Sequence, residues 1–325
     1  MLGLRSAFWQ ELQEDLKQVE GELEKALADI PHCLFREAAL YLHQSGGKRV
    51  RPALAVISAR CCAYPVERVL PLAVALELFH MATLVHDDII DASILRRGRA
   101  TVWVKWGKRF SLCLGNYLFS YAMSFLSHYE DKRINRILVY TSARIAQGEL
   151  EQLARAFDIT VTQQDYFRYI LFKTALLLAS SCQLGALVAG ASEEVSRLFY
   201  RYGRDLGLAF QITDDVLDMV ADGRQLGKPI GTDVRQGVIT LPAIYALNHS
   251  SERDRLAFLL SKRDKGEEEI KETLDLIRKS GGIEYALAVA EGYLEKACRA
   301  AQALPPTPAK ELLLEMAYRV KQRQK

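Results

Sequence analysis

Apolar residues recur at helical spacing along almost the whole chain, and the alternating runs typical of strands are scarce. The Asp-Gly pair Asp222-Gly223 is not followed by an alternating run, so it does not predict a hairpin. Prolines fall near the expected helix boundaries. They are Pro65, Pro71, Pro229, Pro242, Pro305, Pro306 and Pro308. We predict an all-α fold of ten or more helices, in which the linker-like stretch 305–308 precedes a short last helix.

Two of the predicted helices are apolar on every side. One begins at Pro71, a favourable first helical position, and runs to about Asp91. The other runs from about Val195 to Met219. A helix that is apolar all round belongs in the interior of a protein. Each of these helices ends in a group of three aspartates, so the sequence predicts two acid clusters at the ends of buried helices.

The composition fits one large globular domain. Half of the 325 residues are hydrophobic and no linker divides the chain, so we expect a single domain over residues 1–325, although about 150 residues per domain is usual. The net charge of +3 is too small to argue for nucleic acid or an anionic membrane, and local basic clusters matter more. The six cysteines form no pair of C-x-x-C motifs, so a zinc site is not expected, and most of them are predicted to be small core residues.

No apolar run reaches the roughly 20 residues of a membrane span. The nearest, 175–191, is interrupted by Ser180, Ser181 and Gln183 and predicts a buried helix. The N-terminus carries acidic residues early and lacks a signal-type apolar core. We therefore expect a cytoplasmic protein without a transmembrane segment.

The two acid clusters share the pattern D-D-x-x-D. The first and last aspartates of each cluster are four positions apart and lie on one helical face, while the middle one is turned by about 100°. In this order they are Asp87, Asp88 and Asp91 in the first cluster and Asp214, Asp215 and Asp218 in the second. Each cluster alone could be a solvated acidic helix end, but its duplication favours a shared chemical role.

Grouped carboxylates at these positions need a cation. Like charges repel, partial burial of a charge costs several kcal/mol, and a helix C-terminus disfavours an anion by about 0.3–1 kcal/mol. A divalent ion about 4 Å from one carboxylate gains roughly 8 kcal/mol at an effective dielectric constant of 20. Carboxylate oxygens suit Mg²⁺, which also takes ligands from a substrate's phosphates. The clusters therefore predict a magnesium site.

Basic residues fall in short motifs near these helices. Gly46-Gly47-Lys48-Arg49-Val50-Arg51 places three cations beside two glycines, and Lys48 and Arg51 would share a face if a helix begins there. Arg96-Arg97-Gly98-Arg99 begins five residues after the first cluster. An ordinary positive loop explains either motif alone. Beside a metal-diphosphate site, both are suited to bind the same ligand.

Weaker signals come from single polar residues on apolar helices. Lys173 and Thr174 interrupt an apolar helix, Gln211 lies one turn before the second cluster, and His80 lies two turns before Asp87. A lone histidine on such a helix is more often a core residue, but His80 could also donate to a diphosphate. The basic loop 227–233 could close over the site as a lid.

Taken together, these residues resemble the trans-isoprenyl diphosphate synthases. The resemblance covers most of the chain in the family's order and is closest to bacterial long-chain members, such as the catalytic component of heptaprenyl diphosphate synthases. The matching stretches are GGKRVRP (46–52), ELFHMATLVHDDIIDAS (77–93), LRRGRAT (95–101), GE (148–149), KTA (173–175), FQITDDVLD (210–218), GKPIGTD (227–233) and TLP (240–242).

The resemblance implies antiparallel helices around a deep central cavity, the isoprenoid synthase fold, usually as a dimer. It implies three Mg²⁺ ions per active site that bridge both acid clusters to an allylic diphosphate, with Asp87, Asp91 and Asp214 as principal ligands. The residues that match allylic-diphosphate contacts are Arg96, Lys173, Thr174, Gln211 and Lys228. The residues that match isopentenyl-diphosphate contacts are Lys48, Arg51, His80 and Arg97.

The implied reaction is a head-to-tail (1′-4) condensation of isopentenyl diphosphate with an allylic diphosphate such as geranyl or farnesyl diphosphate. Loss of the diphosphate forms an allylic cation in a dry cavity. Thr174 and Gln211 can offer oxygen dipoles to that cation, and Lys173 and Lys228 can bind the leaving group. We find no obvious side-chain base, and in this family the released diphosphate is thought to take the proton.

Three positions depart from the family pattern. Ala100 stands where many members have Pro, and Asn116 stands where many have Asp. Val238 stands where many have a diphosphate-binding Lys, so Lys173 and Lys228 would carry more of that contact. None of these departures removes a residue of the predicted metal site.

The product is expected to grow along the helix that ends at Asp91. Ala82 and Thr83, one turn before Asp87, are small and argue against a C15 limit. Phe79 lies about 12 Å before Asp87 along the helix. We hypothesise that Phe79 forms the floor and limits the product to about C30–C40, and ordinary core packing is the alternative.

Other functions fit less well. A class I terpene cyclase carries a different second cluster and lacks GGKRxRP, and a helical ion-binding module would not need the cations. A non-catalytic subunit should have lost acids or basic residues. Two alternatives stay open: a catalytic subunit that needs a small regulatory partner in a heterodimer, and a shorter-chain farnesyl or geranylgeranyl synthase. Product length, primer, dimer type and the quinone pathway it would serve are not decided by the sequence.

Overall fold

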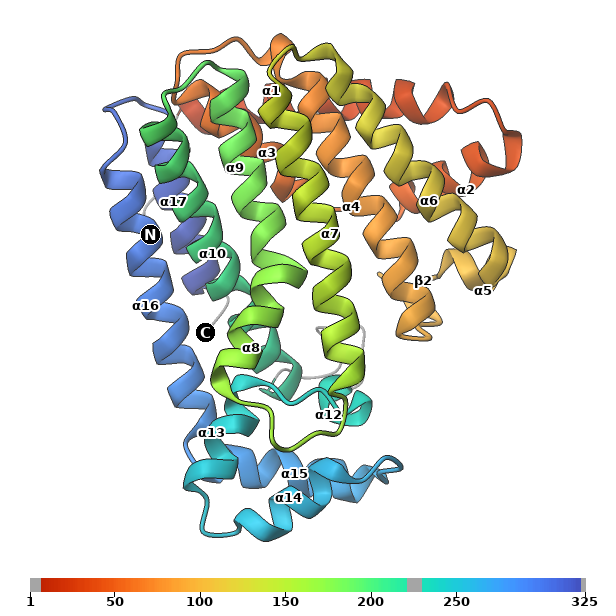
Figure 1. The fold of residues 1–325 in the computed structure, drawn as a ribbon, viewed down its shortest axis with the longest axis vertical. Coiled ribbons are helices and arrows are strands. Elements are labelled where there is room, and N and C mark those ends of the chain that lie inside the picture. The colour runs from red at the N-terminus through yellow and green to blue at the C-terminus, as the bar shows by residue number, and fades with distance from the viewer. Residues whose placement is uncertain (1–6, 221–229, 323–325) are drawn as a thin grey trace. The chain divides into compact units, whose positions relative to one another are not determined.

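The computed structural model describes residues 7–220 and 230–322 (Figure 1). Helices dominate these residues, which confirms the all-α prediction. The chain divides into two compact units. Unit 1 comprises residues 1–138, 181–199 and 304–313, and unit 2 comprises residues 139–180, 200–303 and 314–325. The single domain expected over residues 1–325 stays a prediction.

Unit 1 contains the N-terminal helices, a small hairpin and two 3-10 turns. Its elements are α1 (Ala7–Ala28), α2 (Cys33–Gln44), α3 (Val50–Arg60), η1 (Val66–Arg68), α4 (Leu70–Ile90), β1 (Leu95–Arg96), β2 (Arg99–Ala100), α5 (Val102–Trp106), α6 (Lys108–Phe125) and η2 (Leu126–His128). The core is built on α4, which packs against α1, α3 and α6.

Unit 2 contains the π-helical turn η3 (Leu171–Ala175) and several helices. The helices are α8 (Gln163–Ile170), α12 (Thr232–Gln236), α13 (Leu241–His249), α14 (Arg253–Ser261), α15 (Glu267–Lys279) and α16 (Gly282–Gln302). Four helices have residues in both units. They are α7 (Lys132–Ala154), α9 (Leu176–Val188), α10 (Glu193–Val220) and α17 (Lys310–Gln322).

The two helices predicted to be interior are α4 and α10, and both begin and end within two residues of the predicted positions. Pro71 lies in the first turn of α4, where its missing N–H costs nothing. Most of α4 is buried, and Asp91 caps its end. The stretch 175–191 forms the buried helix α9, and α17 follows the proline-rich stretch as expected.

Two continuous helical stretches, Leu70–Ile90 and Gln163–Val188, are long and apolar enough to span a membrane. Respectively 61% and 72% of their apolar windows are buried inside the protein, as in core helices of soluble proteins. They therefore give no support for a membrane span.

The short β1–β2 hairpin was missed by the sequence prediction. Leu95 pairs with Ala100 and Arg96 pairs with Arg99 in an antiparallel register. The two turn residues, Arg97 and Gly98, have φ angles of 52° and 75°, as a tight hairpin turn requires. Because Arg is not a usual residue at such a position, the turn chemistry gave no signal in the sequence.

Candidate active site

The first acid cluster ends α4 in the predicted arrangement. Asp87 and Asp91 are one helical turn apart, since the Asp91 N–H donates to the Asp87 carbonyl at 2.8 Å. Asp88 is buried and turned away from them. Its Oδ1 accepts hydrogen bonds from Arg96 Nε at 2.8 Å and Nη2 at 2.7 Å. The middle aspartate therefore fixes the end of α4 to the hairpin, and Arg96 is placed within reach of the cluster.

The positive charges of four arginines act on His80. Burial lowers the pKa of His80 well below its usual value, and the neighbouring cations lower it further. These cations are Arg51, Arg97, Arg96 and Arg49. His80 is therefore neutral at physiological pH and can offer an N–H to an anion without adding charge. The predicted isopentenyl-diphosphate residues Arg51, His80 and Arg97 are brought together in unit 1.

Arg51 lacks full compensation for its charge. Burial lowers its pKa to about 10, although Glu77 and Asp87 partly oppose the shift. Its Nε is buried and has no hydrogen-bond partner. A buried guanidinium N–H without an acceptor is costly. A diphosphate oxygen is the type of acceptor that would satisfy it, because Arg binds phosphate with its planar fork.

Lys48 differs from the prediction in one respect. Helix α3 begins at Val50 and Arg49 is its left-handed N-cap, with φ 47°. Lys48 therefore lies before the helix and does not share a helical face with Arg51. It is exposed on the Gly46-Gly47 loop. A Cβ at Gly47 would lie 2.6 Å from Arg49 Nη1, so the glycine allows the Arg49 side chain to fold back over the loop.

Arg49 is held by three side chains that the sequence did not single out. Its Nε and Nη2 donate to the two carboxylate oxygens of Glu20 at 2.8 and 2.9 Å, and its Nη1 donates to Glu77 at 2.9 Å. Nη2 also lies 3.0 Å from His43 Nδ1. Glu20 and His43 are distant in the sequence and carry no motif, so only the fold reveals the contact.

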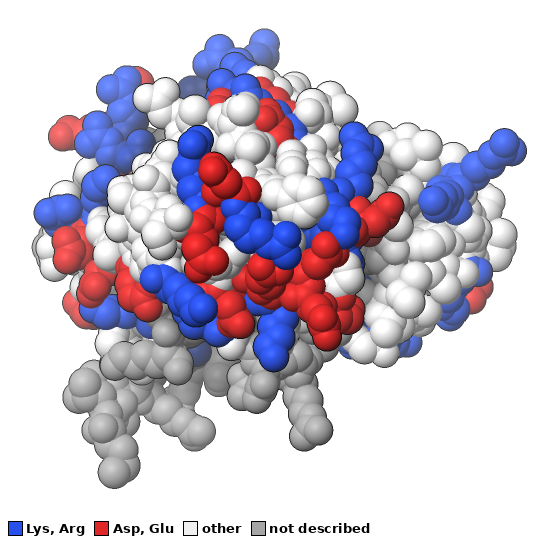
Figure 2. Space-filling model, turned by 90° about the horizontal axis from the view of Figure 1, so that it is seen from below, with Lys and Arg blue, Asp and Glu red and all other residues white. Residues whose placement is uncertain are grey.

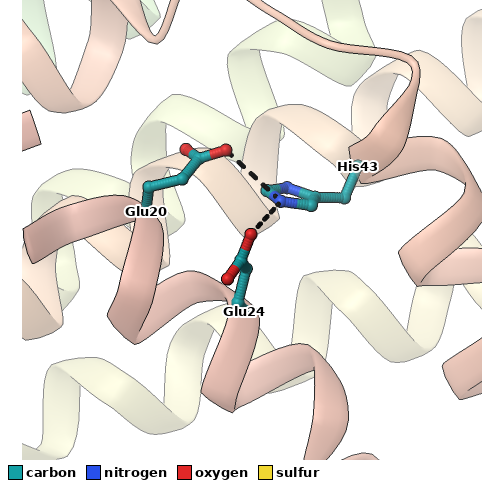
Figure 3. Close-up of side chains that lie close together, drawn as sticks. All are labelled: Glu20, Glu24 and His43. Carbon is teal, nitrogen blue, oxygen red and sulfur yellow. Dashed lines mark ion pairs between the residues drawn. The ribbon is translucent and has the colours of Figure 1, made fainter. Parts of the chain in front are cut away.

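Glu20 and His43, together with Glu24, form a cluster with the composition of a metal site (Figure 3). His43 Nε2 lies 3.3 Å from a Glu20 oxygen and 3.7 Å from a Glu24 oxygen. If Arg49 donates to His43 Nδ1, the proton of the neutral ring lies on Nε2, which then donates to Glu20. A protonated Nε2 cannot bind a metal. We interpret the cluster as a hydrogen-bonded support for Arg49.

The second acid cluster lies near the end of α10. Asp215 is buried and accepts a hydrogen bond from the Tyr166 hydroxyl at 2.6 Å and from Gln211 Nε2 at 2.7 Å. Burial raises the pKa of Asp215, and these two hydrogen bonds only partly oppose that effect. Asp218 Oδ2 accepts from the Asp233 backbone N–H at 3.0 Å. The last aspartate thus anchors the start of α12.

Lys173 and Thr174 lie on the π-helical turn η3 between α8 and α9. Lys173 Nζ lies 3.0 Å from Glu149 and donates to Gln152 at 2.8 Å. The Thr174 hydroxyl donates to Gln211 Oε1 at 2.6 Å. A π-turn shifts the side-chain register within a helix and is frequent at functional sites. Unit 2 therefore joins Thr174, Gln211, Asp215 and Tyr166 in one hydrogen-bonded chain.

Tyr166 is a further residue that the sequence analysis missed. Its hydroxyl is the direct partner of Asp215, and its side chain is fully buried. Seven residues separate it from Lys173, so it lies on the same helical stretch. A tyrosine on an amphipathic helix is common, and nothing in its spacing distinguishes it. The predicted site residue Lys228 and the lid residues 227–229 lie outside the described residues.

The proposed chain-length residues lie in the interior of unit 1. Phe79 and Ala82 are buried, and the Phe79 ring lies 5.2 Å from the ring of Phe119 on α6. Thr83 is partly buried and donates its hydroxyl hydrogen bond to the His80 carbonyl at 2.8 Å. The role of Phe79 as a floor stays a prediction, and Phe119 is a second aromatic side chain at this level.

The donor set of both clusters fits a hard divalent ion. Each cluster places two carboxylates one helical turn apart and holds a third inward. Oxygen ligands of this kind suit Mg²⁺ or Ca²⁺ rather than a soft metal. The arginines near the first cluster suit the phosphates that such an ion would carry.

Comparisons with known proteins agree with this chemistry. The polyprenyl synthetase family matches residues 32–277. Heptaprenyl diphosphate synthase component 2 of Geobacillus stearothermophilus is 41% identical over 317 residues, 98% of each chain. Octaprenyl diphosphate synthase of Escherichia coli is 34% identical over 302 residues, 93% of each chain.

Solved structures are similar over the whole chain. Heptaprenyl diphosphate synthase from Staphylococcus aureus has a TM-score of 0.91 at 36% identity and covers 97% of this chain and 99% of its own. Polyprenyl synthase from Caulobacter crescentus, solved with calcium and isoprenyl diphosphate, has a TM-score of 0.90 at 33% identity, with 97% and 96% covered. Dependence on divalent metals is general in this family. The chain therefore belongs to the polyprenyl synthetase family and is a prenyltransferase with the all-α isoprenoid synthase fold.

Proposed function

We propose that this prenyltransferase extends geranyl or farnesyl diphosphate with isopentenyl diphosphate to a product of about C30–C40. The observation that carries the proposal is the group of arginines around neutral His80, beside the carboxylates that end α4. The arginines can bind the diphosphate of a substrate, and the carboxylates can bind a metal ion. Such a site suits a reaction in which both substrates carry a diphosphate and one of them also binds metal.

In this proposal the carboxylates of both clusters bind Mg²⁺. Asp87, Asp91, Asp214 and Asp218 are the ligands, while Asp88 and Asp215 position the helix ends through Arg96 and Tyr166. Bound Mg²⁺ draws negative charge off the diphosphate leaving group. The family resemblance makes Arg96, Lys173 and Lys228 contacts of the allylic diphosphate, and Lys173 would exchange its bonds to Glu149 and Gln152 for it.

Isopentenyl diphosphate would be bound by the first unit's cations. Lys48, Arg51 and Arg97 provide charge, and His80 provides a neutral donor. Thr174 and Gln211 direct oxygen atoms toward the allylic carbon, and their mutual hydrogen bond fixes both dipoles. The new carbon–carbon bond forms at the allylic carbon, and the released diphosphate takes the proton that is lost.

Product length is proposed to depend on the interior side chains of α4. Small Ala82 and Thr83 leave room for the growing chain, and Phe79 limits it together with its neighbour Phe119. The test is product analysis after Phe79→Ala, with sizing of the dephosphorylated products. We expect products longer by one or two isoprene units. An unchanged length distribution would show that Phe79 only packs the core.

A second candidate concerns the active assembly. Two relatives, at 41% and 37% identity, are named component 2 of a heptaprenyl diphosphate synthase, which favours a different partner chain over a homodimer. Helix α7 supports association with some second chain, because four of its apolar side chains, in two pairs about three turns apart, are more than half exposed. They are Val139, Tyr140, Leu150 and Leu153.

The assembly test uses the purified chain with Mg²⁺, isopentenyl diphosphate and farnesyl diphosphate. Formation of a long product by the chain alone supports a homodimer or monomer as the active form. No product, together with a folded protein, supports a catalytic subunit that needs a small regulatory chain. The burial of most of both long apolar helical stretches supports the cytoplasmic location that we propose.

A further inference from the structure

One stretch of unit 1, residues 92–129, combines cations with exposed apolar side chains and contains no acid. The sequence contains no Asp or Glu between Asp91 and Glu130, while six Lys and Arg residues fall between 96 and 109. Local charge here is twice the net charge of the whole chain. The modest net charge therefore conceals a strongly basic surface, which changes the expectation drawn from composition alone.

The hairpin and α5 form a rigid platform for this surface. The Trp103 indole N–H donates to the Ser93 carbonyl at 2.8 Å, and the Thr101 N–H donates to the Ile94 carbonyl at 3.0 Å. On this platform Ile94 is 63% exposed, Leu95 50% and Val104 45%. We call residues 94–109 the basic–apolar surface. About half or more of each of these aliphatic side chains is therefore exposed on the surface that the structure describes.

Its cations lie over aromatic rings. Arg99 and Lys105 lie 4.4 and 4.0 Å from the centre of the Tyr41 ring, and Lys108 lies 5.3 Å from that of Trp103. Neither these three cations nor Arg109 forms an ion pair with an acid among the residues that the structure describes. Arg96 and Arg97 of the same stretch are used elsewhere, by Asp88 and by the site around His80.

Figure 2 shows a face on which Lys and Arg are mixed with Asp and Glu over much of the surface, next to stretches of uncharged side chains. A protein surface at the membrane–water interface typically combines tryptophan, aliphatic side chains and Lys or Arg. Helix α2 adds one exposed acid, Glu37, to the neighbourhood of Tyr41.

We propose that the basic–apolar surface docks on an anionic phospholipid bilayer. The cations meet the lipid phosphates, and Ile94, Leu95 and Val104 enter the interface. Each Lys or Arg near an anionic membrane strengthens binding about fivefold. Nucleic acid would use the cations but gain little from the aliphatic side chains. Only one consequence rests on the proposed function: a long lipid product would then be released beside the bilayer that dissolves it.

The test is co-sedimentation of the full chain with vesicles. Vesicles of phosphatidylcholine alone are compared with vesicles that contain about one third phosphatidylglycerol, at low and at high salt. We expect binding to the anionic vesicles only, and about 25-fold weaker binding for Lys105→Gln/Lys108→Gln. Ile94→Ser/Val104→Ser should weaken it about tenfold at both salt concentrations, because burial of apolar area is not screened.

Matched controls lie in unit 2. Lys271→Gln/Lys279→Gln removes two exposed cations from α15, and Phe258→Ser removes a side chain that is 56% exposed on α14. Both should bind vesicles as the parent does. Circular dichroism and thermal unfolding of every variant exclude misfolding. Since vesicle binding is measured without substrate, its failure is distinct from a failure of the proposed reaction.

Three results would overturn the proposal. One is the absence of binding to anionic vesicles, and another is equal binding by the Lys105→Gln/Lys108→Gln variant and the parent. The third is a change of oligomeric state in Ile94→Ser/Val104→Ser, measured by analytical ultracentrifugation, which would make this surface a contact between chains. Retention of DNA or RNA without vesicle binding would assign the cations to nucleic acid.

Discussion

The two acid clusters have the same spacing but hold their middle aspartates in different ways. Asp88 is neutralised by Arg96, a full cation that bonds the carboxylate through two nitrogens. Among the residues that the structure describes, Asp215 accepts hydrogen bonds from two neutral groups, the Tyr166 hydroxyl and the Gln211 amide. Burial raises the pKa of Asp215, and these two hydrogen bonds offset only part of that effect. One motif can be supported by charge or by hydrogen bonds, and the support decides how each cluster responds to mutation.

The largest effect is expected when an outward aspartate is removed. Asp87→Asn and Asp214→Asn should each lower kcat/KM by about 10³-fold, because each removes a preorganised charge that binds metal and diphosphate. Steady-state kinetics over a Mg²⁺ titration measures this. The two losses should be similar although the supports differ. Near-normal activity of either variant would remove that cluster from the metal site.

The next prediction separates the two supports. Asp88→Asn leaves Arg96 without its counter-charge and should cost about 2–3 kcal/mol of unfolding free energy. Asp215→Asn keeps the shape of the side chain and leaves no cation without its counter-charge. It should therefore cost about 1 kcal/mol of unfolding free energy. Denaturant unfolding measures both. Adding Arg96→Gln to Asp88→Asn should recover part of the loss, and equal costs for the two single variants would contradict the distinction.

Tyr166→Phe tests the hydrogen-bonded support alone. It leaves Asp215 Oδ2 without its donor, and we expect a five- to tenfold higher Mg²⁺ requirement and a stability loss of about 1–2 kcal/mol. The control is Tyr169→Phe, which removes a hydroxyl one turn further along α8. Tyr169→Phe should leave the Mg²⁺ requirement unchanged. An unchanged requirement in Tyr166→Phe would make its hydroxyl purely structural.

The smallest effect concerns the protonation of His80. Its pKa is depressed in the folded state, so below about pH 6.5 the unfolded chain takes up a proton that the folded chain refuses. Stability from this source is present above pH 6.5 and is lost as the pH falls. Between pH 7.5 and 5.5 the parent should lose about 1 kcal/mol more than His80→Asn.

The His80 prediction also has a kinetic side. His80→Asn keeps a neutral donor and should raise KM for isopentenyl diphosphate less than threefold, whereas His80→Ala should raise it about tenfold. A pH profile in which isopentenyl diphosphate binds better on protonation of His80 would show that the imidazolium is the binding form.

Much of the site was predictable because its signals are local. Helical spacing located α4 and α10, and the four-residue separation placed Asp87 with Asp91 and Asp214 with Asp218. The same geometry predicted that Asp88 and Asp215 turn away. What they turn toward was not predictable, because Arg96 reaches Asp88 only through an unforeseen hairpin turn, and Tyr166 reaches Asp215 across 49 residues of chain.

The sequence by itself determined the helical class, the two interior helices, the spacing of the acids and the membership of a prenyltransferase family, since each depends on patterns within a few residues or on whole motifs. Only the tertiary structure decided the π-turn at Lys173, the bidentate hold of Glu20 on Arg49 and the exposure of Ile94 and Leu95. These depend on contacts between distant segments, where packing and desolvation, not local propensity, set the free energy.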